Sequence, residues 1–262
     1  MGSRPADLAP GTFPGWHRLV VVSPFFLDAT EMTVARARPV IEANGYNPLL
    51  WNGKSDGGAP EDWCTYTHAP GPRDALPINC IDVSRARKIC SRLASGGDLP
   101  TEAQLEYVMG GLAMKRFVWG MDTPTCSDAI WGRNGVGYLS LIVPQTCLPF
   151  AKALSGLGGP EAPGTATRDA LILPGGTIVD VVGNVSEWAR DFHAPQTDDC
   201  WSHQGVLVDP LCETTTLGMR EVNRGGSWGT GGLSLEAASR QNTSIGGTSP
   251  YNGFRCMVPN TN

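Results

Sequence analysis

The stretch Ile178-Val-Asp-Val-Val-Gly-Asn-Val-Ser-Glu-Trp188 places two carboxylates, those of Asp180 and Glu187, on either side of a Gly183-Asn184 turn. Glycine and asparagine tolerate backbone conformations that turn carbonyl oxygens inward. Ca²⁺ is a hard cation that takes about 6 to 8 oxygen ligands, and such a loop supplies them from side chains and backbone. The same residues also fit a strand followed by a turn whose two carboxylates are merely solvated. On its own, this spacing favours the solvated turn.

Composition and charge exclude several classes of protein. The chain has 262 residues, and its 33 Gly and 21 Pro favour short elements joined by irregular loops. The net charge is -5 and no run of Lys or Arg occurs, so we expect no nucleic acid or anionic membrane as partner. No window holds the ~18 uninterrupted apolar residues of a membrane span. Residues 1–17 are rich in Pro and Gly, which predicts an irregular arm or a cloning remnant before one domain at 18–262.

The eight cysteines contain no Cys-x-x-Cys pair, and disulfides are their simplest explanation. The alternative is eight buried free thiols in a cytosolic protein. Spacing suggests three local pairs and leaves two cysteines for a long-range bridge, namely Cys64 with Cys80, Cys126 with Cys147, Cys200 with Cys212, and Cys90 with Cys256. Many other pairings are compatible with eight cysteines. Because disulfides persist in oxidising compartments, we expect a secreted, cell-surface or periplasmic protein whose signal segment is not part of this chain.

Three helices are predicted in the first half of the chain. Residues 33–45 combine an apolar face with a threonine cap and an Asn-Gly stop, and Pro39 should kink this helix or mark its first turn. Residues 82–94 have a second apolar face with basic residues outside it. The third helix begins at Thr101, because Thr101-Glu-Ala-Gln104 matches the capping box.

Strands are expected mainly in the second half of the chain. Short apolar runs separated by Gly, Pro, Asn and Thr occur there, including residues 178–182 and 254–258. An earlier β-branched and aromatic run at 19–28 is broken by Pro24, which predicts two short strands. Residues 46–77 are interpreted as a long loop held by a disulfide. No internal repeat divides the chain.

Six motifs follow one another in the chain: Phe26-Leu-Asp-Ala-Thr-Glu-Met-Thr33, Leu76-Pro-Ile-Asn-Cys80, Leu99-Pro-Thr-Glu-Ala-Gln-Leu-Glu-Tyr107, Val182-Gly-Asn-Val-Ser-Glu-Trp188, Arg224-Gly-Gly-Ser-Trp228 and Asn252-Gly-Phe-Arg-Cys256. In order and separation, the last four resemble the motifs of the formylglycine-generating enzyme (sulfatase-modifying factor) family. The first two are similar to that family's opening motifs. The resemblance covers roughly residues 18–258. It implies a single compact α+β domain of low regular secondary structure, related to the C-type lectin fold.

The resemblance also implies a structural calcium ion in the stretch quoted first. In this family the Gly-Asn-x-x-Glu-Trp loop binds calcium through a side chain three residues before the Gly, two backbone carbonyls and the Glu. The matching residues are Asp180, Gly183, Val185 and Glu187, and their chemistry suits the ion. A second family calcium site matches residues 128–134 poorly, so no ligands are assigned there. Some members also link the positions of Cys90 and Cys256 by a disulfide, in agreement with the spacing.

One departure from the family concerns its catalytic metal. Formylglycine-generating enzymes carry two cysteines shortly after the Gly-Gly-Ser-aromatic motif, and both thiolates hold the copper ion that activates oxygen. Residues 229–242 of this chain contain no cysteine. Copper(I) needs soft ligands, which Ser, Thr and Gly do not provide. We therefore expect no copper and no formylglycine-generating activity.

Two other catalytic interpretations have weaker signals. Some relatives use non-haem iron held by histidines, and His193 and His203 could form such a site with Asp191, Asp198 or Asp199. The histidines lack paired spacing, so solvated loop residues are the favoured interpretation. A hydrolase based on Ser227 is disfavoured because no Gly-x-Ser-x-Gly elbow occurs.

The remaining functional signal is a polar segment at residues 229–252. In the family this region lines the peptide groove, and lectin-like folds, including variable binding proteins of retroelement systems, display ligand-binding residues on the same face. Its Ser, Thr, Gly and Asn content suits adaptable hydrogen bonding. The candidate ligand-binding residues are Trp228, Ser234, Arg240, Asn242, Tyr251 and Asn252.

These signals lead to two hypotheses of different class. The favoured one is a secreted calcium- and disulfide-stabilised module that binds a protein, peptide or glycan. The alternative is a divergent oxidoreductase of the same family, with non-haem iron or another cofactor, that modifies a peptide or small metabolite.

Overall fold

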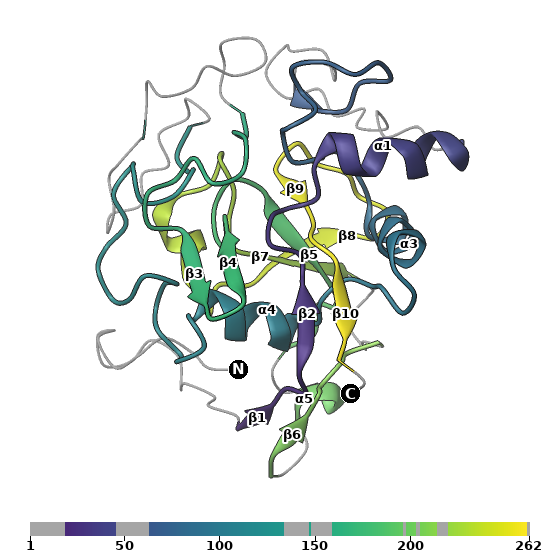
Figure 1. Ribbon diagram of the computed structural model, residues 1–262. Coiled ribbons are helices and arrows are strands. Elements are labelled where there is room, and N and C mark those ends of the chain that lie inside the picture. Colours follow the sequence, from purple (N-terminus) through teal and green to yellow (C-terminus); the bar gives the residue numbers. More distant parts are fainter. Residues whose placement is uncertain are drawn as a thin grey trace.

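The computed structural model describes residues 19–45, 63–133, 147, 159–195, 198–202, 205–213 and 220–260. The arm predicted for residues 1–17 and most of the loop predicted for residues 46–77 lie outside these ranges. Within them, the chain folds as a mixed α+β domain with short elements and long connections (Figure 1). This confirms the predicted fold class.

The predicted helices are present as α1 (Val34–Ala43), α3 (Val83–Leu93) and α4 (Glu102–Met109). Side chains cap the N-termini of α1 and α3. Thr33 Oγ1 accepts a hydrogen bond from the Arg36 N–H, and Asp82 Oδ1 accepts one from the Arg85 N–H. Pro39 lies inside α1 and beyond its first turn. The predicted capping box is also present at α4, where Thr101 and Gln104 exchange side-chain to backbone hydrogen bonds of 3.2 and 2.7 Å.

Ten short strands accompany the helices among the described residues: β1 (Val20–Val21), β2 (Phe25–Leu27), β3 (Ala170–Leu173), β4 (Gly176–Val179), β5 (Ser186–Phe192), β6 (Leu207–Val208), β7 (Arg220–Arg224), β8 (Gln241–Ser244), β9 (Asn252–Gly253) and β10 (Met257–Pro259). The central sheet has the order β8-β7-β5-β9, and three two-stranded sheets pair β1 with β6, β2 with β10, and β3 with β4. The run at 19–28 forms two strands, as predicted. Two short helical turns, α5 (Asp199–Ser202) and η1 (Gly232–Leu235), complete the described elements.

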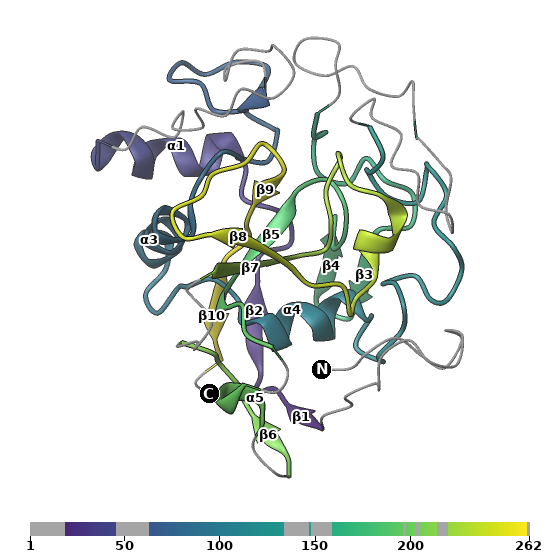
Figure 2. The ribbon, with the colours of Figure 1, turned by 180° about the vertical axis from the view of Figure 1, so that it is seen from behind.

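The two faces of the central sheet carry separate parts of the core. Val222 of β7 packs with Leu105 and Val108 of α4. Trp188 of β5 lies directly opposite Asn223, the next residue of β7, and so points to the other face. There it packs in the cluster that includes residues of α1 and α3. Figures 1 and 2 accordingly show α1 and α3 together and α4 apart from them, with β2 and β10 side by side.

Candidate functional site

The loop between β4 and β5 contains the predicted calcium ligands. The expected strand at 178–182 is shorter than predicted, because Asp180 has a left-handed backbone with φ of 49° and ends β4 at Val179. Gly183 has φ of 78°, and a Cβ there would lie 2.8 Å from the Ile130 carbonyl oxygen, so glycine is required. Asp180 and Glu187 are only 1% and 2% exposed. Their burial contradicts the interpretation as a solvated turn.

A buried arginine from the Gly-Phe-Arg-Cys motif reaches into this loop. Arg255 donates from Nε to Glu187 Oε1 at 2.6 Å and from Nη2 to the Asp180 carbonyl oxygen at 2.6 Å. The ion pair therefore joins two motifs that are 68 residues apart. Sequence reasoning did not find it. The available signal was chemical, since a buried charge requires a partner and both motifs contain one charged residue in apolar surroundings.

Two further buried carboxylates hold the backbone of the loop. Glu31 accepts hydrogen bonds from the Val185 N–H at 2.9 Å and from Asn184 Nδ2 at 2.6 Å. Asp169 accepts the N–H groups of the two residues that follow Asp180, at 2.9 and 3.0 Å. Neither residue was singled out from the sequence. Both fix the conformation in which the predicted ligands lie.

The loop and the side chains that hold it carry four carboxyl groups and one guanidinium group. Burial raises the pKa of Asp180 to about 6 and that of Glu187 to about 7. Burial, together with the other carboxylates, also raises the pKa of Glu31 and Asp169. Arg255 is the positive group that opposes these shifts in each case. A further cation would reduce the remaining repulsion.

The donor set fits calcium in part. Asp180 Oδ2 accepts the Gly164 N–H at 2.6 Å, while its buried Oδ1 has no hydrogen-bond partner among the described residues. That oxygen suits a hard cation. Glu187 Oε1 is already engaged by Arg255. A bound ion would therefore draw on Asp180 and Glu187 together with the carbonyl oxygens predicted at Gly183 and Val185.

The loop also contacts the neighbouring motif through the backbone. The Gly183 N–H donates to the Gly225 carbonyl at 2.8 Å, and the Trp228 N–H donates to the Asn184 carbonyl at 2.8 Å. Ser227 is buried, and its Oγ accepts the Gly229 N–H at 3.3 Å. The hydroxyl thus shapes a turn.

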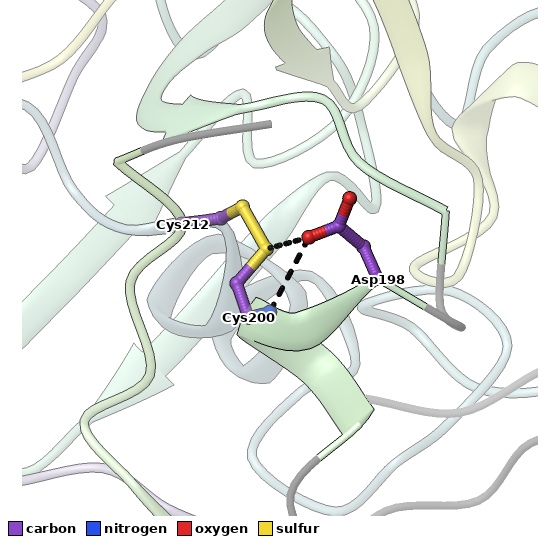
Figure 3. A group of neighbouring side chains, drawn as sticks. All are labelled: Asp198, Cys200 and Cys212. Carbon is purple, nitrogen blue, oxygen red and sulfur yellow. Dashed lines mark hydrogen bonds between the residues drawn. A yellow bond between two sulfur atoms is a disulfide. The ribbon is translucent and has the colours of Figure 1, made fainter. Parts of the chain in front are cut away.

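A second group of candidate metal ligands lies at α5. Within the described ranges, Asp198, Cys200 and Cys212 are the one set of three or more His, Cys, Asp or Glu residues whose ligand atoms lie within 4.8 Å of one another. Figure 3 shows that the two cysteines form a disulfide, with Asp198 Oδ1 at 3.2 Å from Cys200 Sγ. Oxidised sulfur is a poor metal ligand because metal binding requires the thiolate.

The predicted iron ligands are only partly described. His203 lies outside the described residues. His193 is half-buried, and its pKa is lowered by burial and by Arg240. Asp191 accepts the backbone N–H groups of Glu102 at 2.6 Å and Cys212 at 2.9 Å. The aspartate therefore holds two backbone segments together.

All four disulfide pairings suggested by spacing are present: Cys64–Cys80, Cys90–Cys256, Cys126–Cys147 and Cys200–Cys212. No described cysteine is free. The long-range pair links α3 to the segment before β10, and so supports the junction of the N-terminal and C-terminal motifs.

The candidate ligand-binding residues fall into two groups. Trp228 and Tyr251 lie together, with ring centroids 4.8 Å apart, and the Trp63 ring stacks on Trp228 with a centroid distance of 5.6 Å. Trp228 is fully buried and Tyr251 is half-buried, so Tyr251 is the ring that reaches the surface. Trp63 was not identified from the sequence, because its contact with Trp228 joins segments far apart in the chain.

The other candidates lie at η1, next to or on β8, and on β9. Asn242 is exposed, Ser234 is half-buried and Asn252 is buried. Arg240 is half-buried, and its Nη2 donates to Glu102 Oε2 at 2.8 Å. Part of its guanidinium is therefore used to anchor β8 to α4. The residues of this set that can meet a ligand directly are the partly exposed ones.

Comparisons with known proteins agree with this architecture. The model of the sulfatase-modifying factor enzyme 1-like domain matches residues 15–259. Formylglycine-generating enzyme from Mus musculus is 25% identical over 275 aligned residues, which cover 92% of this chain and 68% of that protein. PvdO from Pseudomonas aeruginosa has a TM-score of 0.66 at 17% identity, with 99% of this chain and 90% of that chain covered. Treponema denticola variable protein 1 has a TM-score of 0.58 at 18% identity, covering 92% and 86%.

Proposed function

Because this chain belongs to the sulfatase-modifying factor enzyme 1-like domain family but has no free thiol for copper, we propose that it is a binding module built on that fold. The observation that carries the proposal is the state of the cysteines. All eight are in disulfides, and residues 229–252 contain none. A copper(I) centre needs thiolate ligands, and this chain has no free thiol to supply them.

The catalytic part of the proposal is tested with copper and a peptide. The purified protein is incubated with copper and a peptide containing Cys-x-Pro-x-Arg, and mass spectrometry follows conversion of the cysteine to the aldehyde. We expect the cysteine to stay unchanged. Aldehyde formation would refute the proposal.

The binding surface is assigned to the partly exposed residues of segment 229–252. Tyr251 is held by Trp228, and Asn242 is exposed on β8, which pairs with β7. A paired strand and a packed aromatic ring thus support side chains that differ in chemistry, an arrangement common in binding surfaces. The ligand class that suits these groups is a protein, peptide or glycan with hydrogen-bonding groups around an apolar contact.

The purified protein is screened against a glycan array and a random peptide library to find a ligand. Isothermal titration calorimetry then measures the dissociation constant of that ligand. We expect Tyr251→Ala and Asn242→Ala each to weaken binding by about tenfold or more, as for contacts at the centre of an interface. Ile172→Ala is the matched control, since Ile172 is 81% exposed on β3. Circular dichroism checks that each variant is folded. Absence of any ligand, or equal weakening by the control, would refute the assigned surface.

Calcium and disulfides are proposed to stabilise this module outside the cytoplasm. The support for calcium is the buried negative charge of the loop and the Oδ1 of Asp180, which has no partner among the residues that the structure describes. Four disulfides support the compartment. No described helix is both long and apolar enough to cross a bilayer.

Chelation tests the calcium site. EDTA should lower the melting temperature of the wild type, because an ion bound only to the folded state stabilises it. Glu187→Ala and Asp180→Asn should remove this sensitivity. Asp180→Asn keeps the Arg255–Glu187 pair and suits the left-handed backbone, so it separates ion binding from loss of the ion pair. Glu213→Ala, at an exposed carboxylate, should respond to EDTA like the wild type.

A further inference from the structure

One face of the β7–β8 pair carries a buried polar cluster that lies outside the calcium loop described above. Glu221 and Asn223 alternate along β7 and therefore point to the same face. Their cross-strand partners on β8 are Thr243 and Gln241. Asn252 of β9 joins this group by donating from Nδ2 to Thr243 Oγ1 at 3.4 Å.

Hydrogen bonds fix the orientation of the Asn223 amide. Its Nδ2 donates to Gln241 Oε1 and to Asn252 Oδ1, both at 3.2 Å. Because the amide nitrogen has two acceptors, Oδ1 must point away from them. Asn223 is 3% exposed, and its Oδ1 has no hydrogen-bond partner in the described part of the chain.

Glu221 presents a second acceptor of the same kind. Its side chain is 6% exposed, and its buried Oε2 has no hydrogen-bond partner within the described ranges. Its carboxylate accepts the Gly246 backbone N–H. Ser244, Ile245 and Gly246 are exposed, so this carboxylate lies directly beneath a surface turn.

Glu221 also differs from other buried carboxylates in its charge environment. Glu102, Glu187 and Glu236 each pair with an arginine. No Lys or Arg of the described residues pairs with Glu221, and the charged group beside it is Asp82, whose own partner is Arg85. Burial, and then Asp82, raise the pKa of Glu221 to about 7. Among the described residues, no positive charge therefore pairs with Glu221, and no donor bonds Glu221 Oε2 or Asn223 Oδ1.

We propose that Glu221 Oε2 and Asn223 Oδ1 form a binding site for a primary ammonium group that enters at the turn Ser244–Gly246. An ammonium group supplies the missing charge and three N–H donors, and it accepts no hydrogen bond. Calcium would require about 6 to 8 oxygens, and two unpartnered acceptors fall short of that number. The group belongs either to a small free amine or to a lysine side chain of a partner. This site does not depend on the function proposed above.

The experiment compares thermal unfolding in methylammonium, potassium and tetramethylammonium chlorides at equal ionic strength. Potassium has a similar charge and size to ammonium but no N–H donors, and tetramethylammonium has no donors either. Methylammonium should raise the melting temperature above both, by roughly 3–5 °C at about ten times its dissociation constant. A rise of equal size with potassium would overturn the proposal.

Variants assign the effect to the cluster. Glu221→Gln keeps an acceptor for Gly246 but removes the negative charge, so the methylammonium response should disappear. Glu213→Gln, at an exposed carboxylate, should retain it. Retention in Glu221→Gln would overturn the site.

Two measurements on the wild type complete the test. The Glu221 carboxyl carbon resonance should shift with methylammonium and not with potassium, and an unchanged resonance would overturn the proposal even if Glu221→Gln fails to fold. An acetylated, amidated Gly-Lys-Gly peptide distinguishes the two sources. Stabilisation by the peptide assigns a lysine side chain, while stabilisation by methylammonium alone assigns a small free amine.

Discussion

At the scale of single residues, the loop around Asp180 depends on one arginine. Arg255 is buried and holds Glu187 and the Asp180 carbonyl at the same time. Arg255→Met should lower the free energy of unfolding by about 3–5 kcal/mol, since it leaves the Glu187 carboxylate buried without its partner. Guanidinium chloride unfolding measures the loss.

The matched control is Arg36→Met, because Arg36 pairs with Asp28 at 3.1 Å in a partly exposed position. Its loss should stay below about 1 kcal/mol. Similar losses in the two variants would show that burial of the Arg255 pair contributes nothing to stability.

Spacing in the sequence identified Asp180 and Glu187, because both belong to one local motif. It did not identify Glu31, whose bond to the Val185 N–H spans 154 residues. Spacing also did not identify the cluster of Glu221 and Asn223, because polar residues that alternate along a strand are common and predict no particular site. Contacts between distant segments leave no periodic pattern in the chain, so the local loop could be predicted and its supports could not.

At the scale of elements, helices were predicted well because their signals are local. The caps of α1, α3 and α4 all lie within three residues of the groups that they satisfy. The strand expected at 178–182 is present only up to Val179, since the left-handed backbone of Asp180 ends β4 early. Apolar character indicates burial there, and the loop buries Val181 and Val182 without a strand.

The capping box of α4 gives a prediction at this scale. Thr101→Ala should lower the free energy of unfolding by about 1 kcal/mol, because the Gln104 N–H loses its side-chain acceptor. Ser91→Ala is the control, since Ser91 lies near the end of α3 on an exposed face. Alanine is the better helix former, so that change should be neutral or slightly stabilising. Urea unfolding measures the free energy of unfolding of both variants. An equal change in the two would contradict the stabilising role of the Thr101 cap.

At the scale of the whole molecule, the fold closes by joining the beginning and the end of the chain. β2 pairs with β10, and the Met32 N–H donates to the Phe254 carbonyl at 2.7 Å. The Arg255–Glu187 pair and the Cys90–Cys256 disulfide reinforce the same junction. The order of motifs in the sequence indicated the family, and this closure explains why the last motif must meet the first ones in space.

A disulfide that closes a longer loop should stabilise the molecule more, although the gain grows only with the logarithm of the loop length. Cys90–Cys256 spans 166 residues and Cys200–Cys212 spans 12. In the chain-entropy model, these spans correspond to about 5 and about 3 kcal/mol of unfolded-state destabilisation. Cys90→Ala/Cys256→Ala should therefore lower the guanidinium midpoint more than the matched Cys200→Ala/Cys212→Ala. The reverse order would mean that local packing at α5, rather than closure of the chain, determines what the disulfides contribute.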